Sequence, residues 1–219
     1  MKLSSDRILT THVGSLPRPD ALLDLLEAEN AGGEVDAAAL EAETARAVDD
    51  IVTRQVEAGI DVVSDGEMGK ISYTFYVRHR LAGIGEGDPS RGSDRREMVG
   101  QDMIDHPDLL ERQKTDGSGW AHHFTQPLCI GPVSYGDRAP LERDIAHFSA
   151  AVRTTKPVEG FLNAASPGVL TKFVADTYYP DEDAYVDALA GAMKEEYEAI
   201  HAAGFLLQID CPEIGRAHV

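Results

Sequence analysis

The chain has 219 residues, of which 42% are hydrophobic and 26% are charged, and its formal net charge is −18. This composition is typical of a folded globular protein and excludes a wholly disordered chain. The strong negative charge argues against nucleic acid as a partner, because phosphate groups need Lys and Arg to neutralise them.

The amino-terminal residues contain no apolar run of the kind found in signal peptides, and no stretch approaches the length of a membrane span. The two cysteines, Cys129 and Cys211, lie far apart without metal or redox spacing, which favours reduced thiols. We therefore expect a soluble cytoplasmic protein whose partners are small molecules, and the sequence leaves its oligomeric state open.

Short apolar runs predict five strands in chain order. They lie near residues 8–13, 60–64, 128–131, 158–162 and 205–209. Helical spacing predicts a helix that begins at Pro19, one between Asp36 and Gly59, one from Pro140, and one after Asp181. Alternating strands and helices imply a parallel sheet with helical crossovers.

Two stretches share one plan, namely "VEAGIDVVSDGE" (Val56 to Glu67) and "HAAGFLLQIDCPE" (His201 to Glu213). In each, a helix ends in Ala-Gly, a buried strand follows, and acids come where the strand opens into a loop. We expect an α/β protein with about the first five βα units of a (β/α)8 TIM barrel. A doubly wound open sheet is the alternative, and the missing GxGxxG after the first strand weakens it.

Residues 83–120 are rich in Gly, Asp, Ser, Arg and Pro, so we expect a loop insertion there with one short helix near Asp108 to Gln113. A surface excursion is favoured over a lid.

Active sites of parallel barrels lie at the carboxyl ends of the strands. The predicted strand ends carry His12, Gly14, Ser15, Asp65, Glu67, Asn163, Ser166, Asp210 and Cys211. Acids on two different strands can hold a cationic amine, and the N–H groups of Gly14 and Ser15 can receive a carboxylate. An amino-acid-sized ligand meets both requirements.

Each of these residues also has a purely structural interpretation. Asp65 and Gly66 can form an ordinary turn, and Ser15 can cap one. His12 is the best placed of the histidines because it lies at the end of the first strand. A lone Cys211 beside Asp210 is more often structural than metal-binding.

Four motifs in matching order resemble the cobalamin-independent methionine synthase family, from about Arg7 to Pro212. They are "LTTHVGSLPRP", "DVVSDGEMGK", "AASPGV" and "LQIDCP". The likeness is greatest to the short bacterial members, which correspond to the catalytic carboxyl-terminal barrel.

The resemblance implies a (β/α)8 barrel that moves a methyl group from 5-methyltetrahydrofolate to the thiol of homocysteine and forms methionine, with Zn²⁺ holding that thiol. It implies that Val13, Gly14 and Ser15 bind the amino-acid carboxylate and that Glu67 and Asp210 bind its amine. His12 is a possible further contact.

The family's zinc ligands are a His-x-Cys pair, a Glu and a further Cys on later strands, and none of these segments occurs in the sequence. We therefore predict no metal ligand here, and expect residues 1–212 to be a partial barrel without activity of its own. Residues 213–219, "EIGRAHV", match a translated sequencing adapter and are expected to be a non-native tail.

Other functions stay open. A related barrel can alkylate another thiol such as coenzyme M. A barrel of the uroporphyrinogen-decarboxylase type needs arginines near the mouth, where only Arg18 qualifies. A non-catalytic fragment that binds an amino acid is the alternative outside enzymes.

Overall fold

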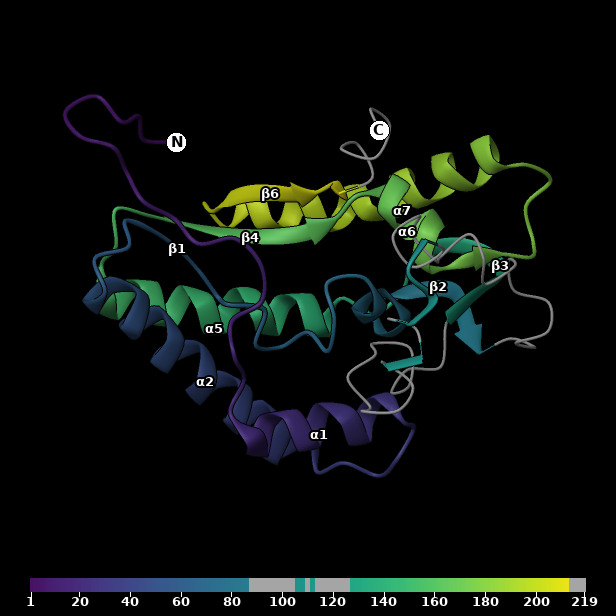
Figure 1. Ribbon diagram of the computed structural model, residues 1–219, viewed down its shortest axis with the longest axis horizontal. Coiled ribbons are helices and arrows are strands. Elements are labelled where there is room, and N and C mark those ends of the chain that lie inside the picture. The colour runs from purple at the N-terminus through teal and green to yellow at the C-terminus, as the bar shows by residue number, and fades with distance from the viewer. Residues whose placement is uncertain (87–104, 109–110, 113–126, 213–219) are drawn as a thin grey trace.

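The structure is a computed structural model, which describes residues 1–86, 105–108, 111–112 and 127–212. Over these residues it is a mixed α/β structure with two three-stranded sheets (Figure 1). The first sheet has the order β1 (Val62–Ser64), β4 (Glu159–Ala165), β6 (Leu206–Asp210), and both of its pairings are parallel. Among the described residues, no helix is long and apolar enough to cross a membrane.

The second sheet has the order β2 (Leu81–Glu86), β3 (Pro127–Tyr135), β5 (Ala175–Asp176). Here β2 and β3 pair antiparallel, whereas β3 and β5 pair parallel. The predicted strand at 128–131 therefore exists, but it lies outside the parallel sheet that was expected to contain it. A short apolar run indicates burial and does not identify the strand's partner, which is why the sequence misplaced it.

The predicted strand at 8–13 is reduced to one isolated parallel bridge between Thr11 and Val62. The Asp61 side chain explains this, because it accepts a hydrogen bond from the Thr10 amide at 2.9 Å and pairs with Arg7. A carboxylate thus replaces part of the strand ladder. Of the predicted insertion, residues 83–86 lie in β2, and most of the remainder lies outside the described residues, as does the tail at 213–219.

The four helices that the sequence predicted are present, whereas the α-helix at Pro167–Phe173 and the 3-10 turn at Phe75–His79 were not predicted. The helices are α1 (Asp20–Asn30), α2 (Ala37–Glu57), α5 (Ala139–Thr155), α6 (Pro167–Phe173) and α7 (Glu182–Ala202), with a 3-10 turn, η1 (Phe75–His79). Asp36 and Asp181 cap α2 and α7 with their side chains, as N-cap residues do. Gly59 and Gly204 end the same helices with φ of 84° and 86°, a conformation that glycine adopts without strain.

In Figure 1, α2 and α5 lie side by side below the first sheet, and α7 runs along β6. The core between these elements is mainly aliphatic, and it includes Leu22, Val52, Phe148, Leu189 and Met193.

A buried ionic network connects the second sheet with η1, α5 and α7. Arg80, between η1 and β2, pairs with Asp144 on α5 and lies 3.1 Å from Glu196 on α7. The hydroxyl groups of Tyr76 and Tyr135 each donate to Glu196 at 2.9 Å. Each charge therefore has an opposite charge or a hydrogen-bond donor, as burial requires.

We predict that Arg80→Met lowers the free energy of unfolding by about 3–5 kcal/mol, because it leaves buried carboxylates without their cation. Arg138→Met is the matched control, since Arg138 pairs with the neighbouring Glu195 at 3.0 Å on the exposed side of α7. That variant should lose at most about 1 kcal/mol. Urea unfolding measures both values, and equal losses would contradict the role given to the network.

Candidate functional site

The turn from Asp65 to Lys70, directly after β1, presents the first acid of the site. Gly66 and Glu67 both have positive φ values, 65° and 59°. Such a backbone is strained for a glutamate and needs support from its surroundings. Arg18 supplies it, because its guanidinium donates to the carbonyl oxygen of Glu67 at 2.8 Å and to that of Lys70.

The Glu67 carboxylate is buried and hydrogen-bonded on both of its oxygens. The Ser15 hydroxyl donates to Oε2 at 2.6 Å, and the Asn163 amide nitrogen donates to Oε1 at 2.8 Å. Since Asn163 lies on β4, this contact joins the turn after β1 to the neighbouring strand.

Asn163 also connects Glu67 to the second predicted acid. The same amide nitrogen donates to Oδ2 of Asp210, at the end of β6, at 2.7 Å. Oε1 of Glu67 and Oδ2 of Asp210 are therefore no farther apart than the sum of these two hydrogen-bond lengths. One nitrogen atom between them contacts both. Gln208 donates to the other oxygen of Asp210 at 2.8 Å.

Lys70 lies behind this amide and is buried. Its ammonium group donates to the backbone oxygen of Asn163 and lies 3.4 Å from the side-chain oxygen of the same residue. It also sits 4.7 Å from the centre of the Tyr76 ring, a cation–π distance. The ammonium group thus faces the oxygen of the Asn163 amide, and the two acids face its nitrogen.

The other predicted residues form the outer side of the site. Val13 is 66% exposed, and a Cβ built on Gly14, whose φ is 91°, would meet no atom within 4 Å. The backbone of this loop is therefore open to a ligand. The His12 ring hydrogen-bonds to the carbonyl oxygen of Gly14 at 2.8 Å, a contact within the loop itself.

The sequence places Asn163 at a strand end without indicating a role for it, and it indicates none for Lys70. The Lys70 position within "DGEMGK" carries no signal of burial, because lysine is mostly exposed in proteins.

Asp65 is the ionisable group most clearly altered by this environment. Burial raises its pKa to about 6, while the charge of Lys70 acts in the opposite direction and that of Asp144 adds to the rise. Its carboxylate accepts a hydrogen bond from the Glu67 amide at 3.0 Å, so it supports the turn from inside.

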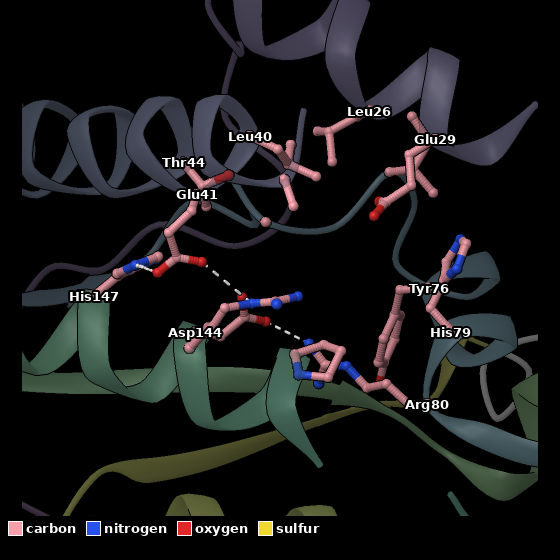
Figure 2. Close-up of a pocket in the computed structure, with 15 residues that line it drawn as sticks. Leu26, Glu29, Leu40, Glu41, Thr44, Tyr76, His79, Arg80, Asp144 and His147 are labelled. Atoms are coloured by element: carbon pink, nitrogen blue, oxygen red, sulfur yellow. Dashed lines mark hydrogen bonds and ion pairs between the residues drawn. The ribbon is translucent and has the colours of Figure 1, made fainter. Parts of the chain in front are cut away.

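A separate cavity of about 100 Å³ lies between α1, α2, α5 and η1 (Figure 2). Glu41 on its wall contacts His147 at 2.7 Å and Arg143 at 3.3 Å. Burial lowers the pKa of His79 on the opposite wall. The ion pair of Arg80 and Asp144 also lines this cavity. Much of the charge of the cavity wall is therefore already neutralised by pairing within the wall.

Within the described ranges, no group of three or more His, Cys, Asp or Glu side chains is arranged to hold a metal ion.

We predict that Asp65→Asn changes the pH dependence of stability. The folded-state pKa of about 6 lies above the ordinary 3.8, so the folded chain binds more protons than the unfolded chain between these values. The native free energy of unfolding therefore falls as the pH rises through this window. The variant has no carboxyl group to ionise at this position and escapes this loss, so relative to native it should gain about 3 kcal/mol between about pH 3 and pH 8. Urea unfolding across this range tests it, and a pH-independent difference would contradict it.

Comparison with known proteins gives sequence relatives, although no family model matches the chain. A methionine synthase from Sulfolobus acidocaldarius is 25% identical over 207 residues, which are 94% of this chain and 52% of the relative. A 5-methyltetrahydropteroyltriglutamate–homocysteine methyltransferase from Mycolicibacterium paratuberculosis is 25% identical over 209 residues, or 94% of this chain and 23% of that protein. The chain thus spans about half the length of the first relative, and less of the second.

Solved structures share the fold. The B12-independent methionine synthase from Shewanella sp. W3-18-1, in complex with selenomethionine, superposes with a TM-score of 0.66 at 21% identity, covering 93% of this chain and 51% of that one. The putative vitamin-B12 independent methionine synthase from Listeria monocytogenes gives 0.58 at 20% identity, covering 93% and 53%. The resemblance predicted from the motifs is confirmed: the chain is a homologue of proteins named methionine synthase, which are methyltransferases.

Proposed function

We propose that this chain forms the amino-acid-binding part of a cobalamin-independent methionine synthase, an enzyme that methylates the thiol of homocysteine. The observation that carries this proposal is the pair of acids, Glu67 and Asp210, held one nitrogen apart beside the open backbone of Gly14. Sequence relatives are named methionine synthase or 5-methyltetrahydropteroyltriglutamate–homocysteine methyltransferase, and a structural neighbour was solved with selenomethionine, an amino acid of the product type.

In this proposal each end of the amino acid has its own partner. The ammonium group contacts Glu67 and Asp210 at the carboxylate lone pairs that Asn163 does not use, where charge-assisted hydrogen bonds are strong. The carboxylate meets the backbone N–H groups of Gly14 and Ser15, as the exposure of this loop allows. Holding both ends fixes the direction of the side chain and so orients the reacting sulfur, which lowers the entropic part of the barrier.

The methyl donor and the metal come from the resemblance. We propose a methylated folate as the donor, and zinc as the ion that would keep the acceptor thiol ionised near neutral pH. The described residues do not supply a ligand set for zinc. We also propose a (β/α)8 barrel as the complete fold, with β1, β4 and β6 as part of its wall; the likeness to the two methionine synthases supports this.

The paired acids also favour homocysteine over the other acceptors. Coenzyme M carries a sulfonate and no amine, so it offers the two carboxylates no cation and adds a negative charge to the site. A uroporphyrinogen-type substrate has many carboxylates and faces the same repulsion. A binding protein without turnover stays a second candidate, and an activity assay separates it from the enzyme.

We predict that Glu67→Gln, made in a protein extended to the length of its relatives, raises the KM for homocysteine about ten- to hundredfold. The reason is the loss of one hydrogen bond to a charged group, about 1.5–3 kcal/mol. The kcat should change less, because the lost contact is made in ground state and transition state alike. Glu57→Gln, an exposed acid on α2, is the control. Unchanged KM and kcat for Glu67→Gln would show that Glu67 does not bind the amine.

We predict that the same extended protein methylates homocysteine and loses this activity when a chelator removes zinc. Steady-state methionine formation, measured before chelation, after it and after zinc is restored, tests both parts. Activity that resists the chelator would contradict the zinc proposal alone. Alkylation of coenzyme M in place of homocysteine would contradict the acceptor, and no turnover with any thiol would favour the binding protein.

A further inference from the structure

We propose that Asn163, oriented by Lys70, is a specificity-determining residue that sets the spacing of Glu67 and Asp210, so that the site selects ligands with a primary ammonium group. This inference rests on the proposed function of the acid pair as an amine site. It adds two residues, one on β4 and one in the turn after β1, to those that the resemblance implies.

The side-chain amide of Asn163 contacts both acids at once. A carboxamide nitrogen has two N–H groups, and in Asn163 the acceptors are Oε1 of Glu67 at 2.8 Å and Oδ2 of Asp210 at 2.7 Å. Two carboxylates this close repel each other, and a donor between them offsets that repulsion. The amide therefore holds both acids at the distance that suits one nitrogen.

Lys70 sets the direction of this amide. The buried ammonium group of Lys70 lies 3.4 Å from Oδ1 of Asn163 and also donates to its backbone oxygen. A flipped amide would put its oxygen against two carboxylates and its N–H groups against the ammonium. Because both contacts would be repulsive, Lys70 keeps the nitrogen turned toward the acids.

The amide in turn affects how a ligand binds. An ammonium group has three N–H donors and can reach the remaining lone pairs of both acids. Without the amide the acids move apart, and a ligand's nitrogen reaches only one of them. A ligand with an amine should then bind with a smaller gain in affinity over the same molecule without the amine. Contacts to the rest of the ligand should stay the same.

The experiment measures that advantage directly. Calorimetric titration of the 219-residue chain compares L-methionine with 4-(methylthio)butanoate, which is the same molecule without its amine. The native chain should prefer L-methionine. In Asn163→Leu and Lys70→Met this preference should fall by at least about tenfold, the value of one hydrogen bond to a charged group, while affinity for the butanoate stays within about twofold.

Asn163→Ser is the second variant if the leucine variant does not fold. A serine hydroxyl has one donor and can serve one acid, so the preference should again fall. Asn30→Leu is the matched control, because Asn30 is also buried and hydrogen-bonded, to Arg78, but lies at the end of α1 away from the acid pair. It should keep the native preference.

The outcomes separate the two proposals. A native chain without preference for L-methionine would overturn the amine site itself, and with it the proposed function. A native preference that persists in the folded Asn163 and Lys70 variants would overturn this inference alone. Equal weakening of both ligands would also overturn it, because that result indicates a structural role.

Discussion

The site depends on one interaction, the hydrogen bonds that Arg18 donates to the turn after β1. The guanidinium donates to the carbonyl oxygens of Glu67 and Lys70 and thereby closes a turn whose backbone is strained at Glu67. The closed turn directs the Glu67 carboxylate toward β4 and β6. It also places the Lys70 ammonium group against the backbone oxygen of Asn163. One side chain from the loop after residue 13 thus determines where an acid and a cation of the next turn lie.

The same turn joins the site to the buried ionic network. Lys70 and Arg80 lie 4.7 Å from the centre of the Tyr76 ring, so one aromatic ring serves two cations. Burial, together with the charge of Glu196, raises the pKa of Tyr76 well above its ordinary value, so its hydroxyl remains a donor to Glu196. The backbone of the turn also packs directly against Asp144 of the network at Gly69, since a Cβ there would lie 2.5 Å from Oδ1 of Asp144. The polar interior is therefore continuous from α7 to the acid pair.

The sequence predicted what local patterns control. The N-caps Asp36 and Asp181 and the C-terminal glycines marked the ends of two helices, and alternation of elements predicted parallel pairing of β1, β4 and β6. Acids at strand ends came together as expected, since parallel strands end at one edge. What failed depends on partners distant in sequence. Residues 128–131 lie in β3, which pairs with β2, Asp61 takes over the Thr10 amide, and the buried Lys70 contacts Asn163 and the Tyr76 ring.

The left-handed backbone conformation of Glu67 affects which residues are favourable at this position. Glycine or asparagine would occupy this backbone position with less strain, but neither would keep both hydrogen bonds that Ser15 and Asn163 donate to the carboxylate. Keeping Glu67 means accepting that strain for the sake of its carboxylate. Backbone strain and recognition are thus opposed at one residue, because the conformation that suits glycine is the one that presents the acid.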